Sequence, residues 1–129
     1  MNATKITSII IGIVVVGILG WGVWYSVQTN NAPGKLDSFA QCLTEKGMKF
    51  YGAFWCPHCQ KMKALFGKSA KYLNYIECST PNGQSQTQIC IDNKIEGYPT
   101  WEFTDGSRLS GEVELSQLTD KTGCELPQQ

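Results

Sequence analysis

The chain has 129 residues, with 11 Lys and Arg, 11 Asp and Glu and one His, so its formal net charge at pH 7 is zero. This length allows one ordinary domain, or one small domain with an appendage. The balanced charge, without a Lys/Arg cluster, excludes the electrostatic footprint of a nucleic-acid binder. Because 42% of the residues are hydrophobic and 11% are aromatic, the composition also excludes a largely disordered chain.

The N-terminal part of the chain is apolar enough to cross a membrane. No charged residue lies between Lys5 and Lys35, and residues 6–27 are mostly Ile, Val, Gly and Trp. As a helix, this segment would span roughly 33 Å, against ~30 Å for the hydrocarbon core of a bilayer. Its C-terminal end is rich in aromatic residues, as is typical of a membrane interface. We expect an uncleaved anchor rather than a signal peptide, because the run is long and no A-x-A-like cleavage site follows it.

The flanking charge and the cysteines indicate the orientation of this anchor. Lys5 and the α-amino group precede the apolar segment, so the positive-inside rule places residues 1–5 in the cytoplasm. All six Cys follow the segment, and disulfides persist in oxidising compartments. We expect a single-pass protein of the cell membrane, with a linker at 28–35 and a periplasmic or extracellular domain at 36–129.

The residues after the linker alternate between helical and strand patterns. The predicted elements, in chain order, are a helix from Asp37 or Ser38 to Gly47, a strand over 48–54, a helix over 57–73 weakened at Gly67, a strand over 74–78, a short helix over 85–93, a hairpin of 99–104 with 107–112, and a helix that ends at Gly123. The hairpin is indicated by Asp-Gly, a strong two-residue turn signal. This order predicts a mixed four-stranded sheet covered by helices, an α/β domain of about 90 residues.

Two cysteines separated by two residues lie at the predicted start of the second of these helices. Cys56 follows a strand, and Pro57 takes the first helical position, where its missing N–H costs nothing. The free N–H groups and the dipole at a helix N-terminus stabilise a thiolate. We therefore expect Cys56 to be the exposed, more acidic nucleophile, and Cys59, one turn further, to be the buried thiol that resolves the mixed disulfide.

Other residues near this pair have candidate functions. His58, the only His in the chain, lies between the two cysteines, and its side chain or backbone N–H is expected to stabilise the thiolate; the alternative is a solvated loop histidine. Pro99 begins a strand, one of the few positions at which a sheet accepts proline. A cis Tyr98–Pro99 bond would let the backbone there pair with an extended substrate. Trp55, Tyr98 and Phe54 are candidates for an apolar docking surface, with core packing favoured for Phe54.

These motifs resemble those of the thioredoxin-like superfamily, and one branch of it in particular. Trp-Cys-Pro-His-Cys after a strand, with Tyr-Pro-Thr-Trp further along, is typical of the superfamily. Together with Leu65-Phe66-Gly67, Tyr75-Ile76-Glu77-Cys78 and Ile95-Glu96-Gly97, the segments around these motifs resemble the thioredoxin-like domain associated with vitamin K epoxide reductase homologues of bacteria and plants. The resemblance covers roughly residues 38–124.

The resemblance implies a thioredoxin-like fold with Cys56 and Cys59 as the redox pair and Pro99 as the cis proline. It also implies a quinone-linked, vitamin K epoxide reductase-like membrane protein as the oxidant. Two features depart from the family pattern. We expect a single apolar anchor in place of the fused integral-membrane reductase. Phe50 lies six residues before the first active-site Cys, where true thioredoxins have a buried acid, and this favours an oxidant over a reductant.

The other four cysteines are candidates for disulfides. The same branch has a cysteine pair at the positions of Cys78 and Cys90, so the resemblance implies a structural disulfide there; a second redox pair that relays electrons is the alternative. This disulfide should contribute roughly 3 kcal/mol. A Cys42–Cys124 bond would attach the C-terminal tail to the first helix of the domain, whereas the alternative leaves Cys42 as a buried free thiol.

We therefore expect a membrane-anchored, extracytoplasmic thiol-disulfide oxidoreductase that oxidises thiols of secreted proteins and needs no cofactor or metal. The alternative enzyme is a reductase or isomerase of the same fold, kept reduced by a membrane electron donor. The non-enzyme alternative is a zinc module of Cys56, Cys59, Cys78 and Cys90. It is disfavoured because structural zinc sites use two closely spaced ligand pairs, and Cys78 lies far from Cys90 in sequence.

Overall fold

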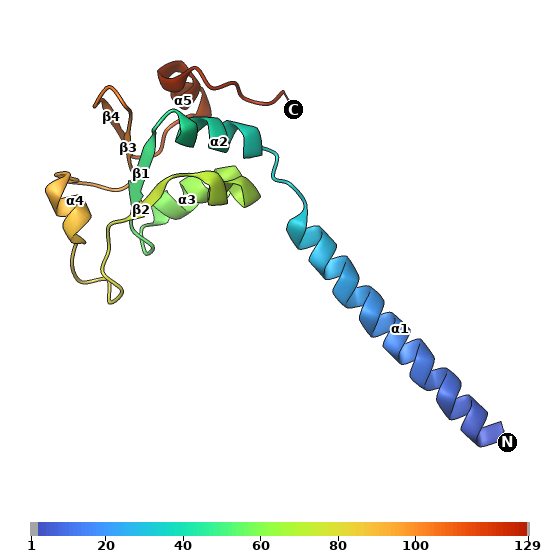
Figure 1. Cartoon of the computed structure of the whole chain (residues 1–129). Coiled ribbons are helices and arrows are strands. Elements are labelled where there is room, and N and C mark those ends of the chain that lie inside the picture. The colour runs from blue at the N-terminus through green and yellow to red at the C-terminus, as the bar shows by residue number, and fades with distance from the viewer. Residues whose placement is uncertain (1–2, 129) are drawn as a thin grey trace. The chain divides into compact units, whose positions relative to one another are not determined.

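The computed structural model describes residues 3–128, with the side chains of 4–28 and 32–128. The chain divides into two compact units between Ala32 and Pro33. The first unit is the N-terminal helix α1, and the second is the α/β domain (Figure 1).

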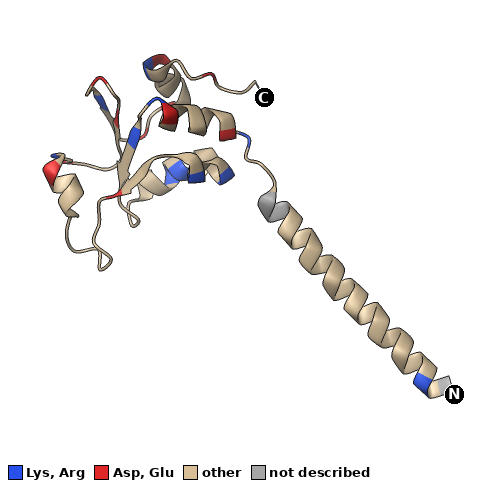
Figure 2. Cartoon of the chain, in the orientation of Figure 1, with Lys and Arg blue, Asp and Glu red and all other residues tan. Residues whose placement is uncertain are grey.

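Helix α1 (Ala3–Asn31) contains a stretch, Thr4–Gln28, that is long and apolar enough to cross a membrane, with a mean hydropathy of 2.4. Lys5 is the only charged residue in the described part of this helix, and Figure 2 accordingly shows the helix tan apart from blue near its start. The helix continues through residues 28–31, where the sequence predicts a linker. The reason is that residues 28–31 contain neither Gly nor Pro, and the first residue that cannot continue the hydrogen-bond ladder is Pro33.

The second unit contains the predicted mixed sheet with helices around it. Its elements are α2 (Asp37–Glu45), β1 (Lys49–Gly52), α3 (Pro57–Phe66), η1 (Gly67–Tyr72), β2 (Tyr75–Glu77), α4 (Gln88–Asp92), β3 (Thr100–Glu102), β4 (Arg108–Ser110) and α5 (Leu115–Thr122). The strand order is β2-β1-β3-β4, with β1 parallel to β2 and the other pairs antiparallel. The expected four-stranded α/β fold is confirmed.

Glycines determine where several of these helices end. Gly47 and Gly123 follow α2 and α5 with φ of 74° and 73°, the left-handed conformation that favours glycine at helix C-termini. Gly67 has φ of 54° and ends α3 at Phe66. The helix predicted over 57–73 is therefore divided into an α-helix and a 3-10 helix.

The core of the domain lies between the sheet and helices α2, α3 and α5. Phe50 on β1 is fully buried and packs against Trp101 on β3. Phe39 from α2 and Phe66 from α3 stack at 6.1 Å on the same cluster. Because β1 is buried along most of its length, the strand that leads to Cys56 and Cys59 is held rigidly.

Two disulfides attach peripheral segments to this core. Cys42 on α2 is bonded to Cys124, which follows α5, with a Cα–Cα distance of 5.9 Å. Cys78, directly after β2, is bonded to Cys90 on α4, with a Cα–Cα distance of 5.5 Å. The first bond holds the C-terminal tail, and the second holds the shortest helix of the domain beside the sheet.

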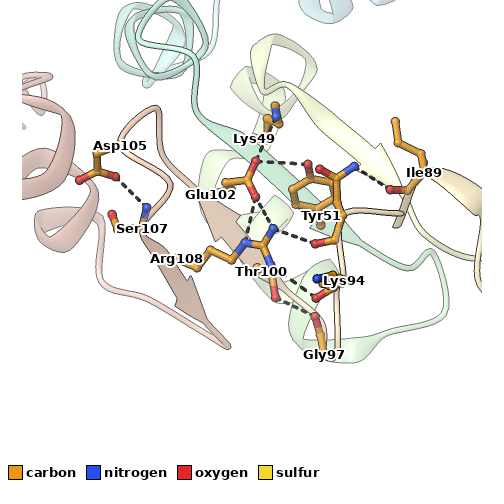
Figure 3. A network of polar contacts seen from close by, with 11 residues as sticks. Lys49, Tyr51, Ile89, Lys94, Gly97, Thr100, Glu102, Asp105, Ser107 and Arg108 are labelled. Atoms are coloured by element: carbon orange, nitrogen blue, oxygen red, sulfur yellow. Dashed lines mark hydrogen bonds and ion pairs between the residues drawn. The ribbon is translucent and has the colours of Figure 1, made fainter. Parts of the chain in front are cut away.

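A polar network on the sheet also holds the segment that follows α4 (Figure 3). Glu102 lies between Lys49 and Arg108, with a Lys49 Nζ–Oε1 distance of 3.0 Å and an Arg108 Nε–Oε2 distance of 2.9 Å. Burial raises the pKa of Glu102, but the hydrogen bonds from Lys49 and Arg108 outweigh this effect and lower it. Arg108 also donates to the backbone carbonyls of Asn93 and Lys94, so one guanidinium connects the sheet edge to the α4 region.

Candidate active site

Cys56 and Cys59 are the two cysteines of the chain without a disulfide partner. Cys56 is the N-cap of α3, and Pro57 occupies the first turn. Cys59 lies one turn further and is 1% exposed. Only a short loop separates the end of β1 at Gly52 from the start of α3 at Pro57. Both sulfurs therefore lie near the end of the sheet.

Cys56 is buried, with 4% of its surface exposed, and the expectation of an exposed sulfur is wrong. The physical reason is the segment that precedes β3, because the carbonyl oxygen of Tyr98 lies over the sulfur and accepts a hydrogen bond from Cys56 Sγ at 3.7 Å. The Tyr98–Pro99 peptide bond in this segment is cis. Pro99 itself is fully buried. The structure thus places Cys56 and the Tyr98–Pro99 segment together, as the sequence predicts.

The two thiols differ in their surroundings. Burial raises the pKa of the Cys59 thiol to about 12, against an opposing effect of the Ala53 backbone, and the nearby Cys56 thiol adds to the rise. In the reduced protein, Cys59 is therefore a neutral thiol at physiological pH. Cys56 is itself the N-cap residue of α3, so its sulfur lies at the positive end of the helix dipole.

The side chain of His58 points to a carboxylate rather than to either sulfur. Its Nδ1 lies 2.7 Å from Oε1 of Glu112, and the ring is 62% exposed. Lys61 forms an ion pair with the other oxygen of the same carboxylate. Hydrogen bonds from His58 and Lys61 lower the pKa of Glu112. The sequence does not predict this contact, because Glu112 lies more than fifty residues away along the chain.

Aromatic side chains form a rim beside the paired cysteines. Trp55 is 49% exposed; its Nε1 donates to Ser79 Oγ at 2.8 Å, and its ring meets Tyr98 edge-on at 6.0 Å. These residues line a groove of about 200 Å³ with the loop over residues 83–86. Phe54 is also 49% exposed, so the expectation of core packing for Phe54 is wrong: it follows the end of β1 and points to solvent.

Three polar residues to which the sequence assigns no function, Lys63, Tyr75 and Glu77, lie close to Cys59. The Glu77 carboxylate accepts hydrogen bonds from the Tyr75 hydroxyl at 2.8 Å and from the backbone N–H groups of Phe54 and Ser79. Lys63 Nζ lies 3.2 Å from the centroid of the Tyr75 ring. Glu77 is the last residue of β2, which pairs in parallel with β1. Because parallel strands have their carboxyl ends at the same edge of the sheet, the end of β2 lies beside the end of β1, close to Cys59.

The Cys78–Cys90 bond occupies two of the four sulfurs that the zinc alternative requires. Within residues 3–128, no cluster of three or more His, Cys, Asp or Glu side chains is placed to hold a metal ion. The zinc alternative therefore lacks its ligand set in the described part of the chain.

A mixed sheet of this order, with Cys-Pro-His-Cys opening a helix beside a cis-proline strand, defines a thioredoxin-like domain. Residues 37–122 match the model of the thioredoxin family, and the chain belongs to that family.

Two curated relatives are similar to this chain. Thiol-disulfide oxidoreductase LTO1 of Arabidopsis thaliana is 46% identical over 106 residues, which cover 79% of this chain and 28% of the plant protein. Thioredoxin domain-containing protein 5 homolog of Drosophila melanogaster is 32% identical over 92 residues, which cover 63% of this chain and 21% of the fly protein. The chain thus spans only about a quarter of the length of these relatives.

Proposed function

We propose that the chain is a protein dithiol-disulfide oxidoreductase in which Cys56 is the nucleophile and Cys59 is the resolving thiol. The observation that supports this most strongly is the free cysteine pair at the start of α3, with Cys56 Sγ against the backbone of the cis Tyr98–Pro99 segment. The similarity to a plant thiol-disulfide oxidoreductase supports the same chemistry.

The catalytic cycle follows from the positions of the two sulfurs, with Cys56 at the N-cap of α3 and Cys59 one turn further into the helix. In the oxidising direction, a client thiolate attacks Cys56 Sγ of the Cys56–Cys59 disulfide; the client–Cys56 bond forms, and Cys59 leaves as a thiolate. A second client thiol then attacks the client sulfur, and Cys56 leaves. The client loses two electrons and two protons, which reduce the pair to two thiols.

The rim beside the pair suits an unfolded client chain. Trp55 and Phe54 present exposed apolar surface, and the groove next to Trp55 and Tyr98 is open to solvent. An apolar rim around an attackable sulfur binds hydrophobic segments, which unfolded secreted proteins expose before their disulfides form. Trp55 and Tyr98 are accordingly proposed as docking residues.

Oxidation of clients is the proposed direction. Phe50 places an apolar ring where true thioredoxins have a buried acid, which favours an oxidant. The alternative, a reductase or isomerase kept reduced by a membrane donor, shares the same site.

For the N-terminal unit, we propose residues 1–5 in the cytoplasm and a single membrane span at 6–27, with the catalytic domain at 36–129 in the periplasm or outside the cell. Because α1 extends to Asn31, the non-helical connection to the domain is limited to residues 32–35. The Cys42–Cys124 and Cys78–Cys90 bonds support an oxidising compartment. The proposed electron acceptor is a quinone-linked, vitamin K epoxide reductase-like membrane protein. It would reoxidise Cys56 and Cys59 near the membrane surface, and the motif resemblance supports it.

The redox potential of the pair tests this proposal. The full chain in detergent micelles is equilibrated with glutathione buffers, and the Cys56–Cys59 disulfide is quantified by mass spectrometry. A potential toward about −120 mV is expected for an oxidant, whereas a value near about −270 mV would support the reductase alternative. A pair that forms no disulfide in any buffer contradicts both.

A further inference from the structure

Cys59 shares one face of α3 with a lysine. Lys63 follows it by four residues, and side chains at this spacing are neighbours on a helix. The half-buried Lys63 turns its ammonium group onto the ring of Tyr75 on β2, with Nζ 3.2 Å from the ring centroid. The charge is thereby directed toward the sheet and away from the exposed side of α3.

Gly52 shows how closely Cys59 and Tyr75 approach the same point. A Cβ placed on Gly52 would lie 3.0 Å from Cys59 Sγ, 2.8 Å from Cε2 of Tyr75 and 3.3 Å from its hydroxyl oxygen. Any side chain at position 52 would therefore separate the sulfur from the ring. The glycine allows the resolving thiol and the Tyr75–Lys63 pair to share one small space at the end of β1.

Glu77 holds the Tyr75 side chain in this position through hydrogen bonds. One of its oxygens accepts the Tyr75 hydroxyl, and the other accepts the backbone N–H groups of Ser79 and Phe54. Burial raises the pKa of Tyr75, and the bond to Glu77 adds to the rise. Tyr75 is therefore a neutral donor that holds its ring under the lysine.

We propose that Lys63, positioned by Tyr75 and Glu77, is the counter-charge of the Cys59 thiolate when Cys59 enters or leaves the disulfide. This inference rests on the proposed function. Lys63 is a positioning and charge-compensating residue, and it forms no covalent bond.

The electrostatics of the site agree with this assignment. The titratable groups that face Cys59 are Cys56, Lys63 and Tyr75, and of these only Lys63 lowers the pKa of Cys59. Burial lowers the pKa of Lys63, whereas the negative charges of Glu77 and Cys59 raise it. The Lys63 ammonium and the Cys59 thiolate therefore stabilise each other in a site where burial disfavours the charged form of each group.

The resolving step requires no reactant other than Cys59 and the mixed disulfide between Cys56 and the client. Cys59 loses its proton to solvent, and the thiolate attacks Cys56 Sγ of a mixed disulfide. The Cys56–Cys59 bond forms, the bond from Cys56 to the client breaks, and the client leaves with the electron pair and takes a proton from solvent. In the reverse direction, Cys59 is the leaving thiolate, and the same ammonium stabilises it.

The test separates the two thiols kinetically. The full chain in detergent micelles, reduced only at Cys56 and Cys59, is mixed with one equivalent of the chromogenic disulfide dithiobis(nitrobenzoate). Attack by Cys56 releases the first coloured thiolate, and attack by Cys59 on the resulting mixed disulfide releases the second. Both phases are followed by stopped flow across a range of pH.

We expect Lys63→Met to slow only the second phase and to move its pH–rate midpoint upward. A midpoint shift of about one unit means tenfold less thiolate at neutral pH; the more basic sulfur is more nucleophilic, so the net slowing is about threefold. Lys63→Arg should restore the wild-type midpoint. The matched control is Lys71→Met, which removes a lysine held over the ring of Tyr72 and should change neither phase.

A second phase with the wild-type pH profile in Lys63→Met overturns the inference. Tyr75→Phe and Glu77→Gln keep the test decisive if Lys63→Met does not fold: both should shift the midpoint in the same direction by a smaller amount, and unchanged midpoints in both overturn it. If the wild-type protein gives no first phase, Cys56 is not a nucleophile and the proposed function is refuted. This result differs from an unchanged second phase in Lys63→Met, which refutes only the function assigned to Lys63.

Discussion

Phe50 of β1 stacks on Trp101 of β3 with ring centroids 4.1 Å apart and planes inclined by 3°. Both residues are fully buried, and they are direct cross-strand partners in the sheet. Because β1 leads into the loop that holds Cys56, this stack supports the strand from which the paired cysteines project.

Loss of the Phe50 ring should strongly destabilise the domain. Phe50→Ala removes a buried aromatic side chain, a change that costs about 3–5 kcal/mol in protein cores. Phe54→Ala is the matched control, since Phe54 is half-exposed and surface substitutions stay within about 0.5 kcal/mol. Urea unfolding of both variants gives the comparison, and similar losses in the two would contradict this description of the core.

The two disulfides should contribute unequally to stability. The Cys42–Cys124 bond closes a sequence separation of 82 residues and the Cys78–Cys90 bond one of 12. The chain-entropy model gives about 4.5 and about 3 kcal/mol, respectively. Paired Cys→Ala variants, unfolded in urea with the active-site pair oxidised, should lose stability in that order; the reverse order would count against the model.

The stability of the reduced protein should fall at high pH. The folded pKa of Cys59 is about 12, above the ordinary value of 9.0. The folded state therefore retains a proton that the unfolded state releases as the pH rises past 9.0, and the stability from this thiol is lost between the two values. Denaturant titrations should show a steeper decline for the Cys59-containing reduced protein than for Cys59→Ala, and parallel curves would contradict the raised pKa.

Trp55 should matter for protein clients and little for small thiols. Trp55→Ala removes exposed apolar surface beside the sulfur pair, and removal of a docking aromatic at an interface costs upwards of about 1 kcal/mol, several-fold in rate. Ile91→Ala, an equally exposed apolar change on α4, is the control. Oxidation rates of an unfolded, reduced protein and of glutathione are compared; equal losses for both substrates would refute a docking function.

Local patterns in the sequence predict much of the fold and the position of the candidate site. The Asp-Gly turn, the helix-ending glycines and the proline after Cys56 each act within a few residues, so the hairpin of β3 with β4, the ends of α2 and α5 and the start of α3 follow from them. Gly67 is the informative difference: the apolar spacing continues to Leu73, but the backbone at Gly67 adopts φ of 54° and the α-helix ends there.

Contacts between distant segments are not predictable in this way. The burial of Cys56 depends on the Tyr98 carbonyl, and the orientation of His58 depends on Glu112. Glu77 reaches the site only because β2 lies parallel to β1. Phe54 shows the opposite case, because a hydrophobic residue next to a buried strand is exposed once the strand ends at Gly52.

Client trapping tests the central claim most directly. Cys59→Ala, expressed as the full chain in its native membrane, should accumulate mixed disulfides through Cys56 with client thiols, because no second sulfur is present to release them. Cys56→Ala should accumulate far fewer, since the raised pKa of its remaining Cys59, about 12, leaves little reactive thiolate at neutral pH. Equal trapping by both variants, or bonds formed mainly through Cys59, would contradict the assignment of Cys56 as the attacking sulfur.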